Sequence, residues 1–143
     1  MAEEKNDDNE QMQSKYYEFQ LINEQLKELQ QQAQVLEEQL GELQSTVEAL
    51  GELKKTKKGE KLLVPVSQGI FAKAELKNNE KLVVNVGANT LVDKGVDETK
   101  ELINERLKRV TEFKDQTMHN IEALSARAKE LLEELQSMVG EEE

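Results

Sequence analysis

The chain has 143 residues, of which 34% are charged and 3% are aromatic, and this composition excludes a thick globular core. The formal net charge of −11 disfavours a nucleic-acid partner, because phosphate binding draws on an excess of Lys and Arg. The sequence has no Cys, no apolar run of membrane-spanning length and no signal-like start, so we expect a cytoplasmic protein without a membrane partner.

Residues 1–8 are rich in acids and are expected to form a flexible N-terminus. Residues 9–56 are predicted to form a first long helix, because apolar residues recur in alternating steps of three and four from Phe19 to Leu50. This heptad pattern is typical of a coiled-coil seam. Lysines gather at the predicted helix end, before Gly59. We interpret them as cations at the negative end of the helix dipole rather than as a binding patch, because acids are interspersed among them.

Residues 60–94 lose the helical period and alternate apolar with polar side chains, which predicts strands. Turn-forming residues divide this segment into two β-hairpins. Four short strands bury little apolar surface and leave unpaired edges, and the helix seams are already occupied, so we expect the hairpins to assemble with other subunits. The predicted oligomerisation residues are Val64, Val66, Ile70, Phe71, Ala72, Leu76, Leu82, Val84, Val86 and Leu91.

Residues 96–139 carry a second heptad seam, followed by an acidic tail at 140–143. This seam is interrupted at Lys114 and Thr117, and we expect Phe113 and Met118 to rotate in and cover the gap. Two seams of similar length can pair antiparallel within one chain. The predicted fold class is therefore α+β, a long antiparallel two-helix coiled coil with two β-hairpins inserted between the helices.

Residues suited to catalysis or metal binding are sparse. His119 is the only His, and its heptad position places it on the outer face of the second helix. No Cys or second His exists to complete a metal site or a nucleophile–base pair, and no glycine-rich phosphate loop is present. We therefore expect no enzyme activity, no catalytic or metal site and no cofactor.

Apolar residues outside the heptad stripe gather at the start of the first helix and at the end of the second. In an antiparallel pair these two ends lie side by side, at the tip farthest from the hairpins. Exposed apolar patches mark interaction surfaces, so we interpret the tip as a binding surface. The alternative is that these residues only thicken the end of the coiled coil. The predicted binding residues are Met12, Tyr16, Tyr17, Phe19, Leu21, Leu131, Leu132, Leu135 and Met138.

The stretches LLVPVSQGIFAKAEL and LVVNVGANTLVDKG resemble the two-hairpin segment of the archaeal-type prefoldin alpha subunit. The order helix, two hairpins, helix is similar over the whole chain, whereas a beta-type subunit carries a single hairpin. The resemblance implies a hexamer of two alpha and four beta subunits, whose hairpins form an oligomeric β-barrel platform. It also implies ATP-independent capture of non-native polypeptides at the helix tips, and their delivery to a group II chaperonin.

Two further hypotheses compete with this chaperone function. One is a structural coiled-coil tether or scaffold subunit, which would use its tips to bind one defined partner. The other is an acidic stalk of a membrane ATPase, but the sequence contains no membrane segment that would support it. For the assembly, a homo-oligomer or a filament is the alternative to the hexamer with beta-type subunits.

Overall fold

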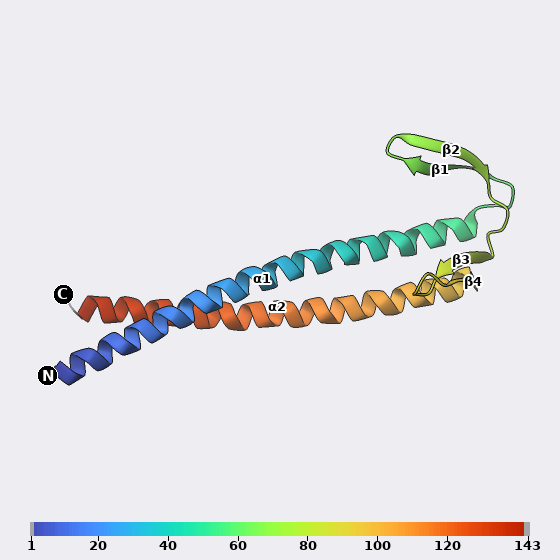
Figure 1. Ribbon diagram of the computed structural model, residues 1–143. Coiled ribbons are helices and arrows are strands. Elements are labelled where there is room, and N and C mark those ends of the chain that lie inside the picture. The colour runs from blue at the N-terminus through green and yellow to red at the C-terminus, as the bar shows by residue number, and fades with distance from the viewer. Residues whose placement is uncertain (1, 142–143) are drawn as a thin grey trace. The chain divides into compact units, whose positions relative to one another are not determined.

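The structure is a computed structural model that describes residues 2–141, and it consists of two long helices separated by four strands (Figure 1). β1 pairs antiparallel with β2, and β3 with β4, in separate two-stranded sheets. The predicted α+β fold class, two long helices with two hairpins between them, is confirmed. In chain order the elements are α1 (Ala2–Lys55), β1 (Lys61–Ser67), β2 (Ile70–Glu75), β3 (Lys81–Asn85), β4 (Leu91–Gly95) and α2 (Val96–Glu141).

Both helices extend further than the sequence pattern predicts. α1 begins at Ala2 instead of residue 9, because residues 2–8 lack Gly and Pro, and Glu3 and Glu4 lie in the first turn, where acids offset the helix dipole. α2 continues through Gly140 to Glu141 instead of ending at 139. A single Gly in a helix costs only about 1 kcal/mol relative to Ala. The rest of the predicted acidic tail, residues 142–143, lies outside the described residues.

The connection from α1 to β1 follows the predicted capping chemistry. Lys54 and Lys55 occupy the last turn of α1, and the Thr56 hydroxyl donates a hydrogen bond to the Glu52 carbonyl at 2.9 Å. Gly59 has a φ of 87°, the left-handed conformation that side chains disfavour. Its N–H donates to the carbonyl of Leu76 at 2.7 Å, which fastens the base of the first hairpin.

The two helices contribute to two compact units. The residues up to Glu38 and those from Thr111 onward form one unit, which we call the terminal unit. Residues Gln39–Val110 form the other, the hairpin unit, with the end of α1, all four strands and the start of α2.

Within the terminal unit, α1 and α2 are antiparallel, since the partner's number on α2 falls as the number on α1 rises. The ion pairs that show this are Lys15–Glu134 (2.9 Å), Glu18–Arg127 (3.1 Å) and Glu37–Lys114. Between the helices, Ile22, Ala128 and Leu131 form a buried cluster, and Leu131 is fully buried. Phe19, Leu26 and Leu124 pack against this cluster, so heptad residues of both helices form the core.

The hairpin unit has its own core, in which Leu50 from α1 meets Val96 and Ile103 from α2. Leu43, Val47 and Leu82 pack against these three residues. Because Leu82 belongs to β3, the second hairpin is anchored on the helices by an apolar contact. A hydrogen bond of 2.8 Å from the Lys54 ammonium to the Asp97 carboxylate joins the end of α1 to the start of α2.

The prediction that Phe113 and Met118 cover the interruption of the α2 seam is wrong. Their side chains are 62% and 41% exposed. Thr117 itself is buried, because its hydroxyl donates to the carbonyl of Phe113 at 2.9 Å and needs no other partner. Lys114 extends its ammonium to Glu37. Each polar residue in the seam is therefore satisfied where it stands, and no neighbour has to rotate.

Candidate functional sites

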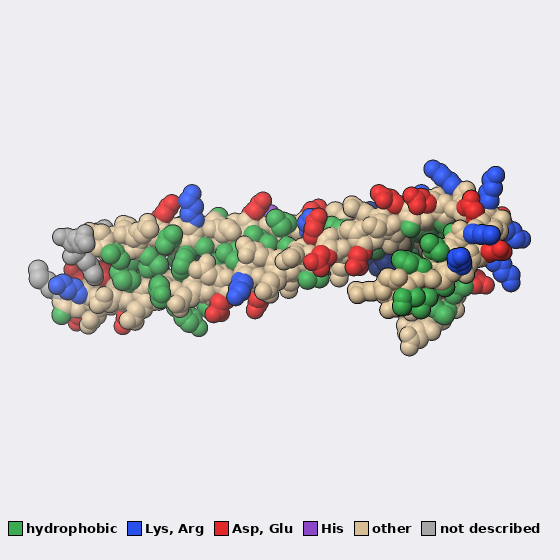
Figure 2. Space-filling model, turned by 90° about the horizontal axis from the view of Figure 1, so that it is seen from above, with side chains coloured by type: hydrophobic (Ala, Val, Ile, Leu, Met, Phe, Trp, Pro, Cys, Tyr) green, Lys and Arg blue, Asp and Glu red, His purple; other side chains and the backbone are tan. Residues whose placement is uncertain are grey.

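An apolar groove lies in the terminal unit, where the beginning of α1 runs beside the end of α2. Its volume is about 560 Å³. Figure 2 shows hydrophobic side chains gathered over both helices near these ends. Most of the lining residues of each helix are three, four or seven positions apart, the spacing that places side chains on one face. They are Met12, Gln13, Tyr16 and Phe19 from α1, and Leu132, Leu135, Gln136 and Val139 from α2.

Five of the nine predicted binding residues line this groove, namely Met12, Tyr16, Phe19, Leu132 and Leu135. The structure adds Val139, whose side chain is 56% exposed. The sequence holds a signal for Val139, because it follows Leu132 by seven positions and lies off the heptad stripe. Gln13 has no such signal, since Gln recurs along α1 from residue 11 to residue 44, and Gln136 has none because a polar side chain off the heptad seam is expected to be solvated.

Three other predicted binding residues are exposed or half-buried elsewhere on the terminal unit. Tyr17 and Leu21, 63% and 42% exposed, are four positions apart and share a face of α1 that does not line the groove. Met138 lines a different hollow, whose other members are polar or charged: Lys15, Glu133, Glu134 and Ser137. The predicted surface is thus divided into an apolar groove and separate smaller patches.

Leu131 requires a correction, because it was predicted as a binding residue and the structure buries it completely. Its side chain packs with Ile22 and Ala128 between the helices. A residue with no exposed surface cannot contact a partner while the helices are paired. Leu131 therefore stabilises the helix pair that carries the groove.

Ion pairs between the helices hold the groove's two walls in register. The Lys15 ammonium donates a hydrogen bond to the Glu134 carboxylate, and this lowers the pKa of Glu134. Arg127 donates to both carboxylate oxygens of Glu18, at 3.1 and 3.3 Å, and these bonds raise the pKa of the guanidinium. All four side chains are partly exposed, so each pair adds little to stability and serves mainly to fix the alignment.

The hairpins form a second candidate site, because most of their predicted contact residues are exposed in the single chain. Val64, Val66, Ile70, Phe71 and Ala72 of the first hairpin are exposed, as are Val86 and Leu91 of the second. Leu76, Leu82 and Val84 are half-buried instead, and Leu82 packs on the helices. The prediction omits Leu63 and Val83, which are 66% and 67% exposed. Alternation along the strand could have identified both, since each follows an inward-facing Leu.

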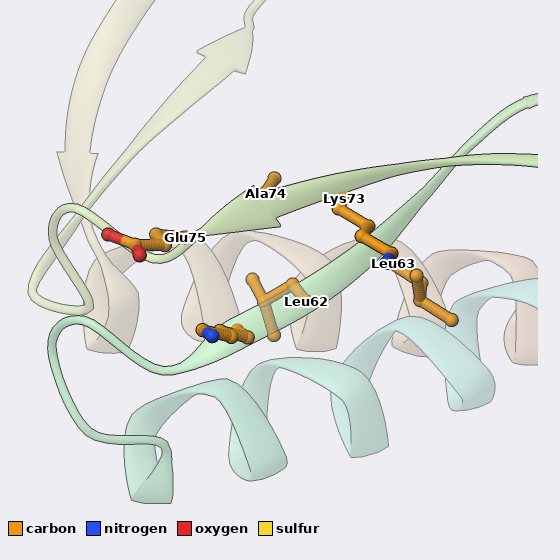
Figure 3. A pocket seen from close by; sticks show the side chains of 6 residues that line it. Leu62, Leu63, Lys73, Ala74 and Glu75 are labelled. Atoms are coloured by element: carbon orange, nitrogen blue, oxygen red, sulfur yellow. The ribbon is translucent and has the colours of Figure 1, made fainter.

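The strand register explains how these side chains are divided between faces. Leu62 pairs with Ala74 and Leu63 with Lys73, so the two pairs point to opposite sides of the hairpin (Figure 3). A shift of register between Pro65 and Ser67 leaves Val66 outside the ladder, as expected for a strand that contains Pro. In the second hairpin Leu82, Val84 and Val92 face inward, while Val83 and Leu91 share the exposed face. Both faces of the first hairpin and one face of the second thus present apolar side chains.

The remaining features concern the single histidine, possible metal sites and possible membrane spans. His119 is exposed on α2, as predicted. Among residues 2–141, no group of three or more His, Asp or Glu side chains is arranged to hold a metal ion. Within the same range, neither helix contains a stretch apolar enough to cross a membrane.

Comparison with known proteins identifies the family. The family model described as "Prefoldin subunit" matches residues 22–141, which is most of the chain. The chain belongs to the prefoldin subunit family. This prefoldin subunit is 34% identical over 83 residues to "Prefoldin subunit alpha" of Thermofilum pendens, and 33% identical over 89 residues to "Prefoldin subunit alpha 2" of Thermococcus kodakarensis. The predicted resemblance to the alpha subunit is confirmed.

These alignments are partial. They cover 58% and 62% of this prefoldin subunit, and 64% and 63% of the two relatives. A solved structure titled "Cryo-EM structure of filamentous PFD from Methanocaldococcus jannaschii" has the same fold, with a TM-score of 0.71 and 23% identity. That likeness covers 80% of this chain and 95% of the other.

The family match begins at Ile22, and this limits what it says about the groove. Met12, Tyr16 and Phe19, which form the α1 wall, precede the matched residues. The α2 wall, from Leu132 to Val139, lies within them. The groove is therefore an observation on this prefoldin subunit's own structure and not a feature transferred from the family.

Proposed function

We propose that this prefoldin subunit is part of a holdase chaperone that captures segments of non-native polypeptide in the groove, without nucleotide. The observation that carries this proposal is the groove itself: six apolar side chains line it, and its polar members are two uncharged amides. Non-native chains expose apolar segments, which a concave apolar surface buries from water. Met12 and Tyr16 can adapt to different segments, because Met is flexible and Tyr has both an apolar ring and a polar hydroxyl.

The size of the groove supports weak binding at each copy and stronger binding by an assembly. About 560 Å³ accommodates a few side chains of a client, not a folded domain. Several such grooves on one oligomer would bind one client with an effective affinity well above that of a single groove. Release then needs no nucleotide, since each contact is modest on its own.

We propose that the hairpins form the assembly contacts. Exposed apolar side chains such as Phe71 and Leu91, together with the free edges of two-stranded sheets, would be buried by pairing with strands of other subunits. The proposed assembly has two alpha-type and four beta-type subunits around a β-barrel platform, and it delivers its client to a group II chaperonin. Native mass measurement with and without a co-expressed beta-type subunit distinguishes this hexamer from a homo-oligomer or filament.

Tyr16 and Tyr17 provide a matched test of the groove. They are adjacent, of the same residue type and similarly exposed, at 55% and 63%, but only Tyr16 lines the groove. The assay follows light scattering by unrelated denatured proteins that aggregate in the presence of the purified complex and no ATP. We expect Tyr16→Ser with Leu132→Ser to reduce protection about tenfold or more per mole of complex, as loss of central apolar contacts does. Tyr17→Ser with Leu21→Ser should have a much smaller effect.

Equal losses from both double variants would contradict the groove as the capture site, provided circular dichroism shows the same helix content. A tether function predicts another pattern: the chain would saturate with one folded partner and would not protect denatured proteins. Protection by the wild-type complex against several unrelated clients would therefore exclude the tether.

A further inference from the structure

The charge of the chain is concentrated in the unit that contains the groove. The terminal unit carries 19 of the 30 Asp and Glu residues and only 6 of the 19 Lys and Arg residues. The hairpin unit is slightly basic, with 11 acids and 13 bases. The net charge of −11 therefore originates in the terminal unit alone, and the two proposed working surfaces differ in sign.

Acids are densest around the groove itself. Residues 2–10, which precede Met12 on α1, contain five acids and one Lys, and every one of their side chains is exposed. On α2, Glu133 stands beside Leu132 and is also exposed. Residues 133–140 contain two acids, Glu133 and Glu134, and no base. A ligand in the groove is thus close to the acidic start of α1 and to Glu133 on α2.

Two basic side chains near the groove are partnered within the chain, whereas Lys129, three positions before Leu132, is exposed. Lys15 binds Glu134 at 2.9 Å, while Arg127 binds Glu18 at 3.1 Å and Glu130 at 3.3 Å. These pairs neutralise part of the local charge and leave the acids of residues 2–10 in excess. Apolar walls of low dielectric concentrate the field of such surrounding charges in a groove.

We propose that the groove selects apolar polypeptide segments that are flanked by Lys or Arg over equally apolar segments that are flanked by Asp or Glu. This proposal rests on the proposed holdase function and specifies its client class. Apolar contacts with Tyr16, Phe19 and Leu132 hold the centre of the segment, and the acids around them attract basic flanks. The uncharged amides of Gln13 and Gln136 make no charged pair with the segment, so selection acts through the surrounding field.

Three labelled peptides test the selection. They share one apolar and aromatic centre and carry Lys, Glu or Ser flanks, and fluorescence anisotropy measures their dissociation constants for the purified complex. At low salt we expect the Lys-flanked peptide to bind about tenfold more tightly than the Glu-flanked one, with the Ser-flanked peptide between them. At about 1 M salt, where the Debye length is about 3 Å, the difference should nearly vanish.

Matched charge variants locate the effect. Asp7→Asn, Asp8→Asn and Glu10→Gln together should reduce the difference between Lys and Glu flanks severalfold, with unchanged affinity for Ser flanks. Glu42→Gln, Glu48→Gln and Glu52→Gln together remove as many exposed acids from the hairpin unit, and they should leave the difference unchanged.

The outcomes separate this proposal from the holdase itself. If all three peptides bind equally at low salt, or if the Glu-flanked peptide binds more tightly, the charge selection is refuted while capture in the groove stands. If the two triple variants reduce the difference equally, the acids around the groove are not its source. If none of the peptides binds, the proposed function itself fails.

Discussion

Leu131 and Leu132 are consecutive on α2, yet the first is fully buried and the second is 43% exposed. One helical step of about 100° separates their side chains, which is enough to turn Leu131 toward Ile22 and Leu132 into the groove. Two residues of one type therefore have separate places in the structure, one in the core that holds the helices together and one in the lining of the groove.

This difference in burial predicts that substitutions of the two residues affect different properties, stability for Leu131 and capture of clients for Leu132. Leu131→Ala should lower the free energy of unfolding by about 2–5 kcal/mol, because it removes a fully buried side chain and leaves a cavity. Leu132→Ser should change it by less than about 1 kcal/mol but should weaken capture of denatured clients. Denaturant unfolding followed by circular dichroism measures the first quantity, and light scattering the second. A large stability loss for Leu132→Ser would show that the groove is part of the packed core.

Charge on the exposed face of the second hairpin should block assembly. Val83→Lys with Leu91→Lys places two charges where we propose subunit contacts, and desolvating them there is costly. We expect the native mass of the complex to fall to that of smaller species while helix content stays the same. Val35→Lys is the matched control, because Val35 is 52% exposed but lies on α1 in the terminal unit. If the native mass of the hairpin variant is unchanged, Val83 and Leu91 are not part of the subunit interface.

The hydrogen bond from Lys15 makes the stability of the terminal unit depend on pH. It lowers the pKa of Glu134 below the ordinary value of 4.5, so its contribution is present above pH 4.5 and is lost as the pH falls through the lowered pKa. Glu134→Gln should therefore flatten the fall in melting temperature between about pH 6 and about pH 3, the range in which carboxyl groups titrate. The effect is small, because both side chains are partly exposed.

Glu133→Gln is the control for this titration. Glu133 is exposed and forms no ion pair with any residue from 2 to 141. The Glu133→Gln variant should therefore have the pH profile of the wild type. If Glu133→Gln flattens the pH profile as much as Glu134→Gln does, the effect comes from the general charge of the unit and not from the pair with Lys15.

Two glycines should respond in opposite directions to substitution by Ala. Gly69, between β1 and β2, has a φ of 77°, so Gly69→Ala should destabilise the hairpin by about 1 kcal/mol. Gly41 lies inside α1, and an added Cβ would meet no atom within 4 Å. Gly41→Ala should therefore raise the free energy of unfolding by about 0.5–1 kcal/mol. Thermal unfolding of both variants checks this contrast, and a stabilising Gly69→Ala would contradict the assigned turn.

Most of the fold could be predicted from local patterns. The heptad spacing that includes Ile22, Leu40 and Leu50 places these residues inside, and the structure buries all three. Alternation along 70–76 indicates the strand that the structure shows as β2. The extra helical turns at Ala2 and Glu141 could not be predicted in this way, because heptad patterning marks the packed part of a helix and not its solvated ends.

The candidate site could be predicted only in part. Composition showed that apolar residues such as Tyr16, Tyr17, Leu131 and Leu132 are in excess at two helix ends, but not which of them share a surface. That depends on the rotation of each helix about its axis, which is set by packing with the other helix. The same packing decides that Thr117 is buried and Phe113 exposed, against the order of their hydrophobicities.

Two seams, two hairpins between them and an acid-rich pair of helix ends can be predicted from local periodicity and residue counts. That Met12, Tyr16 and Phe19 meet Leu132, Leu135 and Val139 in one groove, and that Leu131 does not belong to it, is evident from the folded chain alone. The reason is that residues far apart in the chain become neighbours only through the antiparallel register, which ion pairs such as Lys15–Glu134 and the core around Ile22 define together.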